Sequence, residues 1–295
     1  MTHGRAFGQA PALPDPFGPH QWTATVKVIG EDSNPIIGAN VAASYTIPLS
    51  PSDPNRPRYG EIKGMTDTNG MFSTSHTDSS SDLGVTIEKT GYYNTHIGYQ
   101  FYFDEKRRNP TFTLMLKKIG NPIAMYAKSV NLGMPVFDKP AGFDLMAGDW
   151  IEPYGKGVNA DILFTGHFNK HSDGKSDYTL TVSFSHPGDG IQGLTRDWSM
   201  GVSSLVSLHE APIDGYQPKY EKIQMSNPDR IYYFRVRTVL DSDGNIKSAL
   251  YGKMYGDFMQ FRYYLNPTPN DRNIEFDPKQ NLLGGLQSFE GVSAP

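Results

Sequence analysis

The sequence predicts an all-β protein built of two β-sandwich domains, with an extended N-terminal arm. Three observations predict this class. Apolar and polar residues alternate at period two in many short segments, turn-forming residues separate these segments, and no stretch of useful length shows helical periodicity. A length of 295 residues suits two domains, each large enough to bury its own core.

Shifts in composition divide the chain into five expected segments. The first is an extended arm rich in proline and glycine (1–20), which is followed by an Ig-like sandwich (21–118) and a connector (119–144). A second, antiparallel sandwich (145–276) and a C-terminal tail (277–295) complete the chain. The prolines of the arm favour extended backbone. The connector is assigned because Pro122, Pro135 and Pro140 interrupt it.

Six or seven short strands are expected in the first sandwich, from the segments 23–29, 36–45, 61–65, 71–74, 84–89, 95–103 and 111–116. The second block contains strands expected at 158–168, 178–185, 231–240, 246–255 and 257–265. In the segment that starts at Tyr178, alternation places Tyr178, Leu180, Val182 and Phe184 toward the core.

Three motifs of the first block occur in order: Asn34–Val41 (NPIIGANV), Thr66–Ser73 (TDTNGMFS) and Lys89–Tyr92 (KTGY). Over about residues 22–117 they resemble the carboxypeptidase regulatory-like domain, whose pattern is a P-x-x-G-A-x-V strand, a T-D-x-x-G-x-F hairpin and a following G-Y. The resemblance implies a seven-stranded Ig-like or prealbumin-like sandwich. It also implies a non-catalytic module of a secreted or surface protein, and hence an extracellular or cell-surface location.

Local physics agrees with these motifs. Gly38 allows a kink, Asp67 and Gly70 suit a tight turn, and Phe72 is expected to fill the core. The remainder, including 149–157 and 263–277, resembles uncharacterised secreted bacterial proteins and implies no function.

Composition excludes several classes of partner and site. The net charge of -4 leaves no basic excess for nucleic acid, and Lys106–Arg108 is too short a cluster to change this. The chain has no cysteine, so disulfides and thiolate chemistry are absent. No apolar run is long enough to span a membrane, and residues 1–19 lack the pattern of a signal peptide.

No motif of the sequence indicates a catalytic, cofactor or metal site. There is no His-x-x-Glu pair, nucleophile elbow, P-loop or dinucleotide fingerprint. His167 and His171 share a strand face but stand about 13 Å apart, too far for one metal ion. Asp241–Asn245 indicates a hairpin turn instead of a calcium loop, because the later ligand positions are wrong.

Adjacent aromatic residues on strands point to opposite faces of a sheet. Tyr92–Tyr93, Tyr232–Tyr233 and Tyr263–Tyr264 are such pairs. One member of each pair is therefore expected to leave the sandwich core, where it either stacks on sugars, fills a protein interface or is buried by covering loops.

Three functional classes remain open. The favoured one is a non-enzymatic structural subunit of an extracellular bacterial assembly, a filament or surface layer, in which the arm binds other copies of the chain through Phe7, Leu13, Phe17 and Trp22. The alternative is a secreted module that binds carbohydrate or a cell surface. The third is an enzyme with an unfamiliar site, for which the first acids to inspect are Asp149, Glu152, Asp161 and Asp197. No cofactor is expected.

Overall fold

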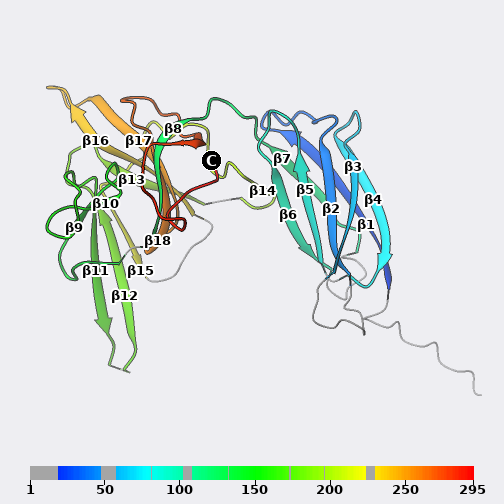
Figure 1. The fold of residues 1–295 in the computed structure, drawn as a ribbon, viewed down its shortest axis with the longest axis horizontal. Coiled ribbons are helices and arrows are strands. Elements are labelled where there is room, and N and C mark those ends of the chain that lie inside the picture. Colours follow the sequence, from blue (N-terminus) through cyan, green and yellow to red (C-terminus); the bar gives the residue numbers. More distant parts are fainter. Residues whose placement is uncertain are drawn as a thin grey trace, which may run out of the picture. The chain divides into compact units, whose positions relative to one another are not determined.

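The computed structural model describes residues 19–47, 58–80, 82–101, 108–131, 133–172, 174–195, 197–223 and 230–295. These residues form strands and loops without a helix, which confirms the all-β class (Figure 1). Within them, no helix could cross a membrane. The chain folds into two compact units: unit 1 contains residues 1–118 and 199–203, and unit 2 contains 119–198 and 204–295.

Unit 1 is a sandwich of a three-stranded and a five-stranded sheet. The smaller sheet has the order β4 (Met71–Asp78), β1 (His20–Gly30), β7 (Thr111–Leu116). The larger has the order β14 (Val202–Ser203), β6 (Thr95–Gln100), β5 (Asp82–Glu88), β2 (Asn40–Ile47), β3 (Arg58–Met65). Alternate residues of both sheets form one apolar core, as period-two alternation requires.

Trp22 is the largest side chain of this core and is only 2% exposed. Its ring lies against Phe101 and Tyr45, at centroid distances of 5.6 and 5.7 Å. Its indole N–H donates to Asp78 Oδ1 at 3.1 Å, which satisfies the one polar atom of the side chain. Trp22 therefore belongs to its own sandwich.

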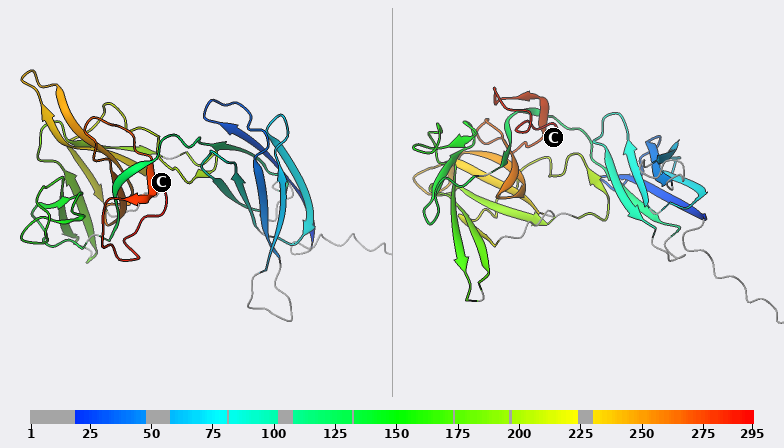
Figure 2. Two further views of the ribbon diagram at one scale, coloured as in Figure 1. Left: turned by 45° about the horizontal axis from the view of Figure 1, so that its top comes forward. Right: turned by 60° about the horizontal axis from the view of Figure 1, so that its bottom comes forward.

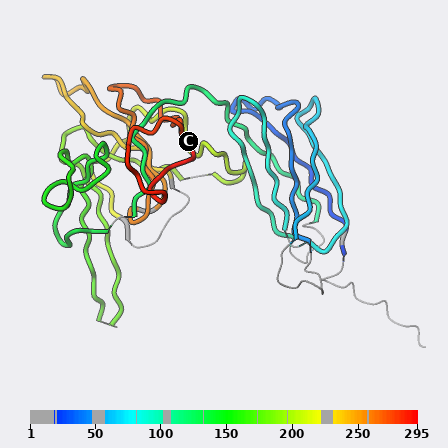
Figure 3. Tube along the Cα trace, in the orientation of Figure 1, coloured from blue at the N-terminus to red at the C-terminus, as the bar shows by residue number. Residues whose placement is uncertain are grey.

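One edge of unit 1 comes from a distant part of the sequence. Residues 199–203 leave the second half of the chain and lie beside β6, where Val202 pairs with His96 (Figure 3). Gly201 makes the close approach possible, because a Cβ there would stand 2.8 Å from Thr95 Cγ2 and 2.9 Å from Leu114 Cδ2. Its φ of 81° also favours glycine.

Unit 2 contains a six-stranded and a five-stranded sheet. The larger has the order β13 (Gly190–Thr195), β16 (Arg230–Leu240), β17 (Ile246–Asp257), β18 (Gln260–Leu265), β8 (Ile123–Asn131), β19 (Phe276–Asn281). The smaller has the order β10 (Asp149–Trp150), β9 (Ala141–Asp144), β11 (Ile162–Lys170), β12 (Ser176–Ser183), β15 (Lys219–Ile223). β11 and β12 extend as a hairpin beyond the rest of their sheet (Figure 2).

The six-stranded sheet carries a core on each face. One face packs against the five-stranded sheet and includes Tyr232 and Tyr263. The other face includes Tyr233 and Tyr264, together with Val292 from the C-terminal segment. All four tyrosines are at most 1% exposed. Of the alternatives left open by the sequence, covering segments therefore bury these two pairs, and they present no sugar or protein surface.

Two expected segments differ in the structure. Residues 119–144 contain β8 and β9 and lie within unit 2, so this range is not a connector; its prolines fall outside these two strands. Residues 277–295 continue β19 and then cover the second face, where Tyr264 Oη donates to the carbonyl of Ala294 at 3.2 Å. The prolines around β8 and β9 were interpreted as loop signals, and no local pattern shows which residues the C-terminal segment covers.

The local turn predictions are confirmed. Asp67 Oδ1 accepts hydrogen bonds from the amides of Asn69 and Met71, and Gly70 has a φ of 72°. Asp241 Oδ1 accepts hydrogen bonds from the amides of Asp243 and Asn245 in the β16–β17 hairpin. In β12, Tyr178, Leu180 and Val182 are buried, and Phe184 packs against the same core.

Replacing Trp22 by alanine should destabilise unit 1 by about 3–5 kcal/mol, because it removes the largest core side chain and leaves a cavity. Differential scanning calorimetry measures the change. The matched control is Tyr59→Ala, since Tyr59 is 71% exposed and its loss should change stability by less than about 0.5 kcal/mol. Equal effects of the two substitutions would contradict the placement of Trp22 in the core.

Candidate functional site

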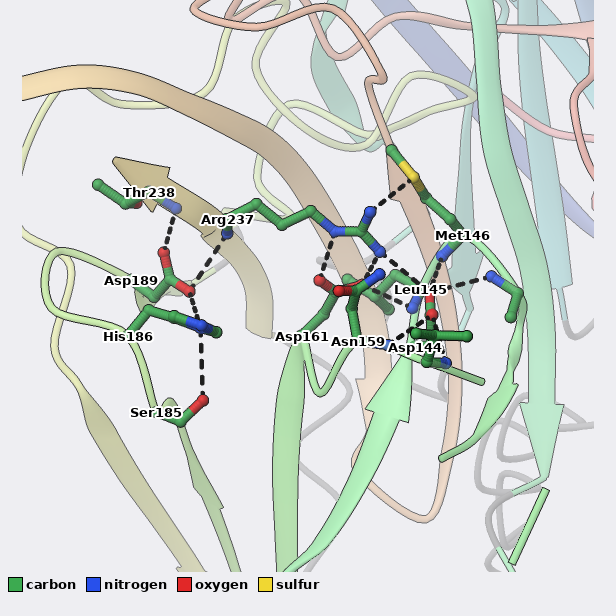
Figure 4. A network of polar contacts seen from close by, with 12 residues as sticks. Asp144, Leu145, Met146, Asn159, Asp161, Ser185, His186, Asp189, Arg237 and Thr238 are labelled. Carbon is green, nitrogen blue, oxygen red and sulfur yellow. Dashed lines mark hydrogen bonds and ion pairs between the residues drawn. The ribbon is translucent and has the colours of Figure 1, made fainter. Parts of the chain in front are cut away.

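A cluster of buried carboxylates lies in unit 2, around the partly buried Arg237 of β16 (Figure 4). Its guanidinium donates to both carboxylate oxygens of Asp161, Nε at 2.7 Å and Nη2 at 2.9 Å. Nη2 also donates to Asp144 Oδ1 at 3.0 Å, and Nη1 lies 3.0 Å from Met146 Sδ. Asp144 and Asp161 are 3% and 2% exposed. One side chain of the six-stranded sheet thus binds two acids at the ends of strands of the other sheet.

A β-bulge directs Arg237 to these acids. Ile231, Tyr233 and Arg235 lie on the far face of the sheet, and regular alternation would place Arg237 there as well. Between the pairs Val236–Leu250 and Val239–Ser248 the register shifts. Arg237 has a φ of 54°, in the left-handed region that usually requires glycine in such a bulge.

Asp189 holds the bulge in place. Its two carboxylate oxygens accept hydrogen bonds from the backbone amides of Arg237, at 3.2 Å, and Thr238, at 2.8 Å. The bulge would otherwise leave these donors without a partner in the strand ladder. Left-handed backbone at a residue other than glycine costs roughly 1–2 kcal/mol, which these bonds and the ion pairs offset.

Each acid of the cluster has a shifted pKa with a different balance of causes. Burial raises the pKa of Asp161, and the hydrogen bonds and charge of Arg237 reduce this rise without reversing it. Burial likewise raises the pKa of Asp189. At Asp144, burial acts upward, but backbone hydrogen bonds from Asn159, Val158 and Ala147, with the charge of Arg237, outweigh it and lower the pKa.

The cluster is therefore arranged to join two sheets. Besides Arg237, Asp144 accepts four backbone hydrogen bonds, from Met146, Ala147, Val158 and Asn159, and Asp161 accepts one from Leu145. Carboxylates this well bonded have little capacity left for abstracting a proton from a substrate.

Ser185, His186 and Asp189 lie together at the edge of the cluster, in the residue types of a hydrolytic triad. Ser185 Oγ stands 3.4 Å and Asp189 Oδ2 3.6 Å from the same atom, His186 Nδ1. A triad needs the serine and the acid on different ring nitrogens, so that the proton taken from one is balanced at the other. This arrangement cannot relay a proton in that way.

Of the four acids selected from the sequence, the structure brings only Asp161 into the cluster. Asp149 Oδ1 accepts a hydrogen bond from the Trp150 amide and Oδ2 one from the Lys156 amide, which supports a local turn. Glu152 and Asp197 are exposed. Sequence reasoning missed Asp144, Asp189 and Arg237, because no fixed spacing joins three separate strand ends and a bulge.

The histidines bind separate partners, as the strand spacing predicts. His167 Nδ1 lies 2.7 Å from Asp138 Oδ1, and His171 Nε2 lies 2.9 Å from Asp177 Oδ2. Across the described ranges, no group of three or more metal-ligating side chains comes together.

The predicted assembly residues have different outcomes. Phe7, Leu13 and Phe17 lie outside the described residues. Trp22 was expected to join them as a docking side chain, and the structure corrects this, because Trp22 is buried in its own core and hydrogen-bonded to Asp78.

Two surface features of unit 2 remain. Phe137 and Phe168 are 39% and 63% exposed and lie 4.8 Å apart beside Tyr178. A shallow hollow of about 400 Å³ lies between the ends of β8, β17 and β18 and is lined by Arg262 and Phe289, among others. Neither brings acid, base and nucleophile together.

Comparison with known proteins finds no matching family model and no matching curated protein. Among solved structures, shaft pilin SpaA from Lactobacillus rhamnosus GG is 12% identical, over 75% of this chain and 89% of that one, with a TM-score of 0.23. A streptococcal ancillary pilin is 12% identical over 72% of this chain and 52% of its own, with a TM-score of 0.21.

A 3-chlorocatechol 1,2-dioxygenase from Rhodococcus opacus 1CP is 13% identical and has a TM-score of 0.26. The match covers 34% of this chain and 60% of the dioxygenase. Similarities of this size carry no conclusion about the function of this chain.

Replacing Arg237 by methionine should destabilise unit 2 by about 3–5 kcal/mol, because two buried carboxylates lose their counter-charge. Removing the acids too, in Arg237→Met/Asp144→Asn/Asp161→Asn, should recover part of this loss. Lys63→Met is the control: Lys63 pairs with Glu61 but is 71% exposed, so its effect on the urea unfolding free energy should stay below about 1 kcal/mol.

The Arg237→Met variant should also gain stability, relative to the native chain, when the pH falls from 7 toward 5. Without Arg237 the pKa of Asp161 rises further above its unfolded value, so the folded state prefers the protonated acid. The destabilisation is then fully present above the raised pKa and disappears toward the unfolded value of about 4. Melting temperatures of both proteins at several pH values test this; a pH-independent difference would refute it.

Proposed function

We propose that this chain is a non-enzymatic structural subunit of an extracellular bacterial assembly, a filament or surface layer, in which an extended arm of one copy joins the β-sheet of the next. The observation that carries the proposal is a long unpaired sheet edge in unit 1. β3 has eight residues and, among the described residues, pairs only with β2. An unpaired edge is a template for strand addition.

The backbone of this edge has a defined polarity. The amide of Thr66, directly after β3, donates to the carbonyl of Ala39 on the β2 side. Since successive amides of a strand point to opposite sides, the amides of Tyr59, Glu61, Lys63 and Met65 point away from β2. These four residues are also exposed in side chain, and Tyr59 and Met65 are 71% and 61% exposed.

The sequence of the arm suits one-sided pairing. Pro14 and Pro16 lack amides on one edge of an extended strand, whereas Leu13, Asp15 and Phe17 keep theirs on the other. Burial of each apolar anchor contributes about 1.5–3 kcal/mol, and ordering each residue costs about 1–2 kcal/mol. Backbone hydrogen bonds to β3 would supply the additional stabilisation that the arm needs.

Binding of a carbohydrate is the second candidate. The exposed pair Phe137 and Phe168, next to the polar pair Asp138 and His167, favours it, because sugars stack on aromatic rings and hydrogen-bond to polar groups. Glycan-array binding that is lost in Phe168→Ala would support it.

Deletion of residues 1–20 should leave a folded chain that no longer assembles, as seen by light scattering and negative-stain microscopy. Glu61→Pro should have the same effect with the arm intact, because it removes an outward amide from β3 while sparing the bonds to β2.

Glu61→Ala is the matched control and should assemble normally, since the ion pair of the Glu61 side chain with the exposed Lys63 contributes little. Normal assembly of both the deletion and Glu61→Pro would refute strand addition at this edge.

A further inference from the structure

The first strand of unit 1, β1, and the last strand before the chain enters unit 2, β7, are neighbours that run in the same direction. β1 and β7 pair in parallel over six consecutive positions, from Thr25–Thr111 to Gly30–Leu116. Further bonds extend the contact at both ends: the amide of Thr23 donates to the carbonyl of Arg108, and the amide of Lys118 lies 3.4 Å from Glu31 Oε2. We call this pair the amino-terminal clamp.

Unit 2 has a related but less regular arrangement. Its first strand β8 and its last strand β19 also pair in parallel, at Ile123–Phe276 and at Met125–Asn281, with a shift of register between these two pairs. The Asn281 side chain takes the place of a backbone pair in this ladder. Its Oδ1 accepts a hydrogen bond from the Ala127 amide at 3.2 Å, and its Nδ2 donates one to the Ala127 carbonyl at 2.8 Å. We call this pair the carboxy-terminal clamp.

A buried carboxylate reinforces the carboxy-terminal clamp where the chain enters unit 2. Glu275, 2% exposed, accepts hydrogen bonds from the amides of Gly120 and Asn121 at 3.0 and 2.8 Å. Asn273 Nδ2 donates to the Asn121 carbonyl at 2.7 Å, and the Ile123 amide donates to the Glu275 carbonyl at 2.9 Å.

The two clamps follow each other directly along the chain. β7 ends at Leu116 and β8 begins at Ile123, so a pull on the backbone passes from one clamp to the next. The first clamp closes a loop of residues 31–110. The second closes a loop of residues 132–275, which also contains the β14 segment that pairs in unit 1. While the clamps hold, both loops lie outside the direct path of force from β1 to β19.

Pulling apart the outer ends of two parallel strands loads all their hydrogen bonds together, in shear. Pulling both strands at the same end loads one bond at a time and opens the pair like a zipper. Because each backbone bond is individually weak, simultaneous loading makes the pair far more resistant. We propose that this chain is a tension-bearing element in which the two clamps carry force along the backbone. This property goes beyond assembly and belongs to the single chain.

Single-molecule force spectroscopy on the full chain tests the proposal. The sequence has no cysteine, so Gln21→Cys/Leu282→Cys provides two unique handles that load both clamps in shear. Rupture should occur in two events at high force. Their extension gains identify the clamps, since the closed loops correspond to about 300 Å for unit 1 and about 500 Å for unit 2.

Two comparisons show whether the clamps carry the force. Gln21→Cys/Arg108→Cys pulls β1 and β7 at the same end and should open unit 1 at a force several-fold lower than the shear geometry does. Glu275→Gln and Asn281→Leu should each lower the force of the longer event, and the shorter event in the same traces is the internal control.

Equal rupture forces in the two pulling geometries would overturn the proposal. So would a longer event that is unchanged in both Glu275→Gln and Asn281→Leu. Neither result depends on assembly, because each molecule is pulled alone, so failure of the clamps and failure of strand addition at β3 are separate outcomes.

Discussion

The architecture of unit 2 depends on one partly buried cation, Arg237, between two buried acids. The bulge directs the side chain of Arg237 to the face of its sheet where Asp144 and Asp161 lie. Asp189 stabilises the bulge because it accepts hydrogen bonds from the backbone amides of Arg237 and Thr238. Buried carboxylates are tolerated when each of them is paired with an opposite charge. The arrangement fixes the register of β16 against β17 and the position of the 144–161 loop at the same time.

This constraint explains why the cluster does not resemble an active site, although it concentrates carboxylates, a histidine and a serine. An active site leaves at least one polar group with unsatisfied bonding capacity toward a substrate. Here the backbone amides of the 144–161 loop and the guanidinium occupy the acids, and the histidine offers one nitrogen to both neighbours. The residue types are those of catalysis, whereas the connections between them are those of a cross-link between sheets.

Sequence patterns predicted the all-β class, the two turns at Asp67 and Asp241 and the core face of β12, because each depends on residues close together in the chain. The patterns failed where burial is two-sided. One member of each tyrosine pair was expected to leave the sandwich core, and nothing local shows that the segment around Val292 covers Tyr233 and Tyr264. β8 and β9 were assigned to a connector because of nearby prolines, which the structure places outside both strands.

The candidate site was even less accessible to sequence reasoning. Asp161 stood out as an acid before a strand, but its partners lie 17, 28 and 76 positions away at Asp144, Asp189 and Arg237. A left-handed arginine in a bulge has no sequence signature, since the position normally holds glycine. Only the assembled sheets reveal that these four residues form one network.

The β14 segment has a consequence for the order of biosynthesis. The ribosome completes Lys118 long before it reaches Val202, so the edge of unit 1 beside β6 stays uncovered while some eighty further residues are made. At roughly 5–20 residues per second this interval lasts several seconds. Unit 1 therefore reaches its final form only after much of unit 2 has been synthesised. The β14 segment, which lies within the sequence of unit 2, is the last strand to join the sheet of unit 1.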